Sequence, residues 1–231
     1  MYFDNPADVA YKVREQNFIT RVYGWMCFAL VITGLVALFV ASTPQIVGII
    51  ITNQILFIGL IIVEILAVVA MTALINKISF FSASALFIGY AVLNGITFSV
   101  ILLGFTGASV ASAFFATAGT FAVMSCYGWY TKKDLTTIGN LCFMALIGII
   151  IASVVNIFLH SSMMYWIITY VGVLIFVGLI AYDTQKIKRM SGQFEVNSEI
   201  GKKAALMGAL ALYLDFINLF LMLLRILGGR K

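Results

Sequence analysis

Two aspartates stand out because each lies in a stretch that is otherwise mostly apolar. Asp183 lies in IAYDTQKIK and Asp215 in LYLDFINLF, and no other charged residue lies within nine positions of Asp215. Carboxyl groups in apolar surroundings are costly, so inside a membrane they indicate a functional site by default. Two carboxyl groups that meet there form one titratable unit, which holds a proton or binds a hard cation such as calcium. The expected chemistry is therefore binding of protons and calcium.

The composition indicates that both aspartates belong to a membrane protein. Of 231 residues, 63% are hydrophobic and 10% are charged, whereas soluble domains carry roughly 25% charged residues. The net charge of +5 comes from a few basic clusters, a pattern that suits loops beside an anionic leaflet better than a nucleic-acid surface. Cys27, Cys126 and Cys142 form no CxxC pair. We therefore expect buried thiols, and neither a zinc knuckle nor a disulfide framework.

Seven apolar runs are long enough to cross the hydrocarbon core, which requires about 20 residues. Short polar breaks separate most of them, and the one long loop is expected at 185–202. We predict an all-α membrane protein with a cytoplasmic tail at 1–21 and a single transmembrane domain at 22–231. The predicted spans are 22–42, 54–75, 80–103, 108–130, 136–158, 163–184 and 203–226.

The basic residues predict the orientation. Eleven lysines and arginines lie in the N-terminal tail and in alternate loops, and the intervening loops hold none. By the positive-inside rule the N-terminus is cytoplasmic. Arg225, at the end of the last run, and Arg230 and Lys231 after it would lie outside, so either that run crosses fully, which we favour, or it is re-entrant. We expect an integral, multi-pass protein of a bacterial plasma membrane.

Helical spacing places Asp215 on an inward face. A stripe of small or short polar residues runs through the last span, opposite a face of Leu, Phe and Met, and such stripes pack against neighbouring helices. The alternative for Asp215 is a lone neutral acid bonded to one neighbour, and for Asp183 it is an interfacial carboxylate paired with loop lysines. The two differ in apparent depth, so their meeting requires a tilted helix or one that starts late. The stripe consists of Ala204, Gly208, Ala211, Asp215 and Asn218.

Other polar residues inside the spans suggest a route for cations. Glu64 lies in the middle of the second span and Asn94 begins NGITFS in the third. We predict that these two residues and Asn218 line a cation path; the alternatives are a protonated structural Glu64 and helix-packing polarity at Asn94. Lys77 is a candidate latch for an aspartate, or an ordinary loop lysine. His160 is the only histidine, which excludes a multi-histidine metal site.

Four stretches resemble signature segments of the Bax inhibitor-1 family, also called transmembrane Bax-inhibitor-motif or lifeguard proteins. They are NGITFS, TKKDL at 131–135, VGLIAYDTQKI at 177–187 and ALALYLDFINLFLMLLRILG at 209–228. The resemblance implies a central C-terminal helix surrounded by six others. It also implies a pH-sensitive calcium leak gated by a di-aspartyl pair, here Asp183 and Asp215.

The resemblance further implies an acidic pore residue and an arginine latch in the second span. Glu64 matches the acidic residue, but no arginine lies there and Lys77 is the nearest cation. A lysine cannot grip a carboxylate in bidentate fashion, so this part of the family mechanism departs from the pattern.

We therefore expect a calcium leak channel that is not an enzyme and holds no permanent cofactor, with calcium bound transiently at Asp183 and Asp215. Its expected partners are the lipid bilayer, calcium and protons, with unidentified proteins and no nucleic acid. The alternative is a non-transporting interaction protein that modulates proteases or cell-death machinery. An intramembrane aspartyl protease fits Tyr182-Asp183, but its Gly-x-Gly-Asp and Pro-Ala-Leu motifs are missing.

Overall fold

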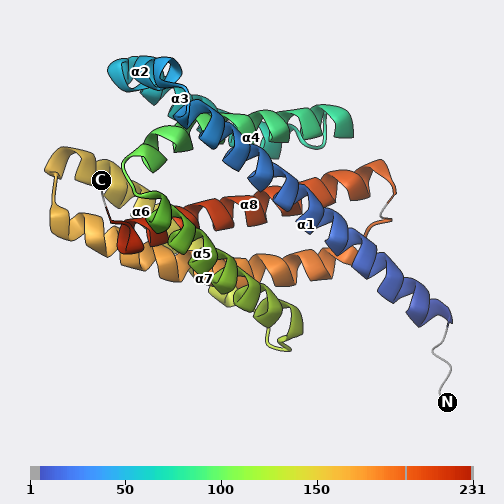
Figure 1. Ribbon diagram of the computed structural model, residues 1–231. Coiled ribbons are helices and arrows are strands. Elements are labelled where there is room, and N and C mark those ends of the chain that lie inside the picture. The colour runs from blue at the N-terminus through green and yellow to red at the C-terminus, as the bar shows by residue number, and fades with distance from the viewer. Residues whose placement is uncertain (1–5, 196, 230–231) are drawn as a thin grey trace. The chain divides into compact units, whose positions relative to one another are not determined.

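The structure is a computed structural model that describes residues 6–195 and 197–229, and the side chains of these residues from 12 onward. In these ranges it contains eight helices and no strand (Figure 1). Seven of the described helices are long and apolar enough to span a membrane, which confirms the predicted all-α, seven-span class. The helices are α1 (Pro6–Ala41), α2 (Pro44–Thr52), α3 (Gln54–Leu74), α4 (Phe80–Leu103), α5 (Gly107–Tyr130), α6 (Thr136–Leu159), α7 (Ser162–Ser191) and α8 (Glu199–Leu227).

The helices extend beyond the predicted spans at the polar ends. Helix α1 begins at Pro6 within the predicted tail, and the short helix α2 was not predicted. The prediction of a long loop at 185–202 is wrong, because α7 continues to Ser191 and α8 begins at Glu199. Lysine, arginine, glutamate and glutamine favour helix strongly, so a helix continues after its apolar run ends. Counting apolar residues therefore places helix ends too early.

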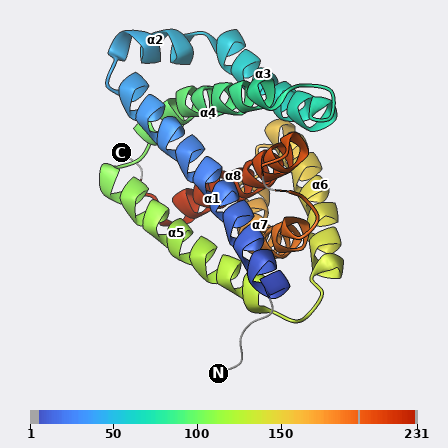
Figure 2. The ribbon, with the colours of Figure 1, turned by 90° about the vertical axis from the view of Figure 1, so that its right-hand side faces the viewer.

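The first compact unit contains α1 to α4 and α8 up to Tyr213. Helix α1 lies against α4, where a Cβ on Gly95 would come within 2.8 Å of the Thr33 carbonyl oxygen. The Thr33 hydroxyl donates to the Ala91 carbonyl at 2.9 Å and lies 2.7 Å from the Tyr213 hydroxyl. One buried threonine thus ties α1 to both α4 and α8. Figure 2 shows α2 as the link between α1 and α3.

The second compact unit contains α5, α6, α7 up to Arg189, and α8 from Leu214. Two glycines allow close approach to α7: a Cβ on Gly128 of α5 would collide with the Ala181 carbonyl, and one on Gly139 of α6 with the Tyr182 ring. The stretch of α7 directly before Asp183 is therefore packed tightly by two neighbouring helices, which restrains its backbone.

The buried residues of α8 cover a wider part of its surface than the predicted stripe of small and short polar residues. In a strongly apolar stretch of 18 residues of α8, half of the residues are buried, whereas none are buried in the comparable stretch of α6. Asp215 and Gly208 are buried as expected, but Leu212, Phe216 and Leu219 are buried too. The prediction of a single packed face is therefore wrong, since α8 is covered over a wide arc. Its central position in the family fold stays a prediction.

The expectation of buried thiols is also wrong. Cys27 and Cys126 are exposed and Cys142 is partly exposed, and all three are free cysteines. Their side chains lie within spanning helices, where an exposed apolar surface faces lipid rather than water. Thiols in that position are covered by the bilayer instead of by protein.

Candidate functional site

The aspartate pair, Asp183 of α7 and Asp215 of α8, lies entirely within the second unit. Ser198 directly precedes helix α8, and its hydroxyl accepts from the Gly201 N–H at 3.0 Å; Glu199 follows in the first turn. A serine cap and an acidic first turn are favourable at a helix start. Helix α8 starts earlier than predicted, not later, and α7 ends later. Asp183 therefore lies well inside its helix instead of at the end of it.

The two carboxyl groups meet through a side-chain hydrogen bond. Such a bond requires one of the two to carry a proton, because an ionised carboxylate is only an acceptor. Asp215 is 5% exposed, and no donor among the described residues reaches its buried Oδ2. The pair is therefore the polar centre of an otherwise apolar region.

Asp183 is less enclosed than Asp215. It is only partly buried, and the positive charge of Lys186, three residues further along α7, acts on it. The Lys186 ammonium group lies 5.9 Å from the centroid of the Tyr182 ring. Among the described residues no third His, Cys, Asp or Glu completes a metal cluster. Asp183 is thus the less enclosed member of the pair, whereas Asp215 is the enclosed one.

The segment of α7 after Asp183 is fastened to the 131–135 loop by Gln185. This side chain is 7% exposed; its amide N–H donates to the Lys133 carbonyl at 2.8 Å, and its Oε1 accepts from the Leu135 N–H at 2.9 Å. Arg189 donates to the same Oε1 at 2.7 Å and forms an ion pair with Asp134 at 2.8 Å. We name Asp134, Gln185 and Arg189 the loop clamp.

The loop clamp gives a physical reason for two of the signature stretches, because it joins TKKDL to YDTQKI. Sequence reasoning did not identify its members as functional. Two signals were available in the sequence. Gln185 is a polar residue directly after the predicted span 163–184, and Asp134 directly follows two lysines. The Thr136 side chain, the Arg189 guanidinium and the Thr136 N–H hold the pKa of Asp134 well below its usual range.

Glu64 and Asn94 belong to a polar cluster in the first unit. The Thr97 hydroxyl donates to Glu64 Oε1 at 2.5 Å. Asn94 is 4% exposed, lies near Tyr90, and its Nδ2 has no hydrogen-bond partner among the described residues. A buried amide donor without a partner costs free energy. The structure therefore brings these two predicted path residues into one cluster that retains unused hydrogen-bonding capacity.

Asn218 and Lys77 have different surroundings. Asn218 lies one turn after Asp215 and is partly buried, and its Nδ2 donates to the Leu214 carbonyl of its own helix at 2.8 Å. The amide oxygen Oδ1 of Asn218 is therefore the group that remains available to line the predicted cation path. Lys77 is exposed after the end of α3 and belongs to the first unit. Its role as a latch for the aspartate pair stays a prediction.

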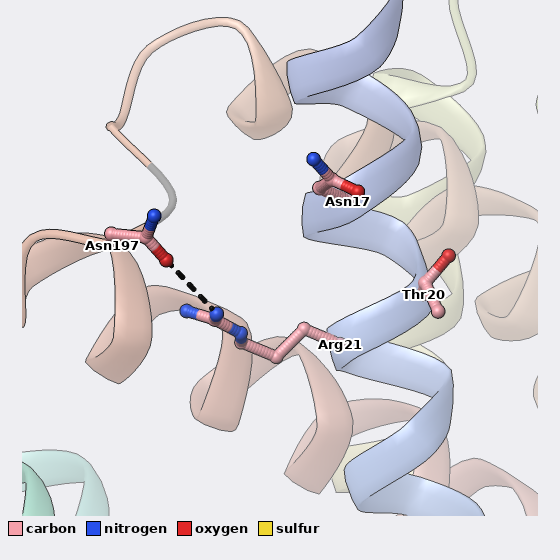
Figure 3. A pocket seen from close by; sticks show the side chains of 4 residues that line it. All are labelled: Asn17, Thr20, Arg21 and Asn197. Atoms are coloured by element: carbon pink, nitrogen blue, oxygen red, sulfur yellow. Dashed lines mark hydrogen bonds between the residues drawn. The ribbon is translucent and has the colours of Figure 1, made fainter.

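An open cavity of about 330 Å³ lies in the first unit, between α1 and the segment before α8. Figure 3 shows Asn17, Thr20 and Arg21 on α1, with the Arg21 side chain reaching Asn197. The Arg21 guanidinium donates to Asn197 Oδ1 at 3.2 Å. These contacts fasten the α7–α8 connection to α1, and we assign no ligand to the cavity.

Comparisons with known proteins cover nearly the whole chain. A profile of the family described as "Inhibitor of apoptosis-promoting Bax1" matches residues 15–231. The inner membrane protein YbhL of Escherichia coli is 48% identical over 217 residues, which make up 94% of this chain and 93% of that protein. An uncharacterized protein of Borreliella burgdorferi is 42% identical, with 94% of each chain covered. Together with the seven spans, these matches identify an integral, multi-pass membrane protein.

Proposed function

Since the chain belongs to the family described as inhibitor of apoptosis-promoting Bax1, we propose that it is a pH-sensitive calcium leak channel. Gating would take place at the aspartate pair. The observation that carries this proposal is the hydrogen bond between the carboxyl groups of Asp183 and Asp215. A carboxyl pair of this kind changes both its charge and its bonding when it loses a proton.

The gating step follows from the chemistry of the pair. With one proton present, the shared hydrogen bond holds α7 and α8 together at this depth. Without it, two negative charges repel each other unless a cation lies between them. The tightly packed backbone before Asp183 resists movement, since Gly128 and Gly139 leave no space beside it. The response to proton loss is therefore expected mainly in α8.

Calcium is the transported ion in this proposal, not a resident cofactor. Calcium takes six to eight oxygen ligands, and two carboxylates supply only about four oxygens. No third acid joins the pair among the described residues. Binding would thus be weak and brief, as conduction requires. Glu64, Asn94 and Asn218 are proposed to line the path, and no enzymatic activity is proposed.

The experiment is calcium flux into liposomes that contain this protein alone, followed with an internal calcium-sensitive dye at acidic and neutral pH. We expect flux above that of empty liposomes, and a rate that changes with pH. A flux that is independent of pH would refute gating by the pair. Absence of flux from folded protein would refute the channel.

A second candidate rests on the family description, which names an inhibitor of a cell-death protein. In that case the chain would act through protein contacts without transport. Absence of flux would favour this function. The relatives, among them an inner membrane protein of Escherichia coli, support a bacterial plasma membrane as the location of either proposed activity.

A further inference from the structure

A second polar site lies in the second unit, where the end of α6, the start of α7 and the end of α8 surround a pocket of about 570 Å³. We name it the outer pocket, because seven full crossings from a cytoplasmic N-terminus, as predicted from the sequence, would bring it to the outer side of the membrane. It plays no part in the proposed gating. Its lining includes His160, Ser161, Ser162, Tyr165, Trp166 and Arg225.

Arg225 is the one permanently charged side chain in the lining, which contains no acid. Its guanidinium carbon lies 5.2 Å from the centroid of the Tyr165 ring, so a cation–π contact orients the group. No carboxylate of the described residues forms an ion pair with it. An arginine carries five N–H donors and no acceptor, which leaves its donors available to an anion in the pocket.

Hydroxyl groups add further donors. The Ser161 hydroxyl accepts from the Met164 N–H at 3.3 Å, so its own proton remains free to donate. Ser162 is exposed at the start of α7. Planar guanidinium groups bind phosphate through paired hydrogen bonds. A phosphate anion is therefore the chemistry that the pocket fits.

The aromatic surroundings indicate where that phosphate comes from. Trp166 lies edge-on to Tyr165 at 5.7 Å and is stacked with Tyr170 at 5.8 Å between ring centroids. Trp166 and Tyr170 are exposed, and such residues concentrate at the level of lipid headgroups. We propose that the outer pocket binds the phosphate of an anionic phospholipid headgroup, with Arg225 as its main ligand.

Binding of phosphatidylglycerol to detergent-purified full-length protein, measured by native mass spectrometry, tests this proposal. Arg225→Gln should weaken binding about tenfold, because it removes a charge-assisted hydrogen bond. Ser162→Asp should weaken it similarly by repulsion, and an acid at the start of α7 does not disturb that helix. The matched control is Lys132→Gln, which removes one positive charge at an exposed position between α5 and α6 and should leave binding unchanged.

Several outcomes would overturn the proposal. Unchanged binding in Arg225→Gln and Ser162→Asp would remove the outer pocket as the site. An equal loss in Lys132→Gln would show attraction by net charge alone. A separate measurement adds inorganic phosphate at the same concentration as the lipid. If phosphate displaces the lipid, the ligand of the pocket is free phosphate and the proposal is wrong. If it does not, the result supports the lipid headgroup.

Discussion

At the scale of single residues, the candidate site depends on two acids with opposite surroundings. Asp215 is buried and bonded to Asp183, so any change of its protonation changes a helix contact. Asp134 is exposed, lies outside the spans and is paired with Arg189. The first kind of acid can couple a proton to a conformation, and the second remains charged throughout the physiological range.

We predict that Asp183→Asn and Asp215→Asn each remove the pH dependence of calcium flux in proteoliposomes. An asparagine preserves the size of the side chain and one hydrogen bond, but it cannot lose a proton. Glu195→Gln is the matched control: it also replaces one carboxyl group, at an exposed position between α7 and α8, and it should leave the pH dependence intact. If both pair variants retained wild-type pH dependence, the aspartate pair would have no part in gating.

Asp134 itself makes a separate prediction about stability. Its pKa is lowered by the Thr136 and Arg189 contacts, so its contribution is fully present above the ordinary pKa of about 4 and is lost as pH falls below that value. Asp134→Asn should slightly lower the melting temperature in detergent at neutral pH. The difference should shrink in acid, and a difference that stayed constant would contradict this account.

At the scale of helices, the site is supported by glycines and by the loop clamp. Gly128 and Gly139 allow α5 and α6 to approach α7 directly before Asp183. Gln185 then fastens α7 to the 131–135 loop through two backbone hydrogen bonds. Because the position of Asp183 is restrained from three directions, α8 is the element expected to respond to the proton.

Gly128→Ala tests this packing. Its Cβ would collide with the Ala181 carbonyl, and overpacking of this kind costs about 1–3 kcal/mol. Gly119→Ala on the same helix is the control, because nothing lies within 4 Å of a Cβ there; it should be neutral or slightly stabilising. Thermal unfolding in detergent measures both variants. Equal melting temperatures for the two would show that α5 does not constrain α7.

At the scale of the whole molecule, the charges on the loops govern sidedness. Helix α8 is one unbroken helix of 29 residues, which is longer than the roughly 20 residues that a full crossing requires. We therefore predict that a C-terminal reporter lies on the opposite side of the membrane from an N-terminal one. Reporter fusions active only in the cytoplasm or only outside it measure this, and the same side for both ends would indicate a re-entrant α8. Arg230 and Lys231 lie outside the described residues.

The sequence by itself determined the class of protein, seven spanning helices and the buried position of Asp215. These are local properties, because in lipid each helix satisfies its own backbone and must carry its own apolar length. Only the tertiary structure decided that Asp183 meets Asp215, that Gln185 reaches the 131–135 loop, and that Thr97 bonds to Glu64. Such contacts depend on helix tilt, depth and close approach at glycines, and hydrophobic patterning along one helix carries no information about its neighbours.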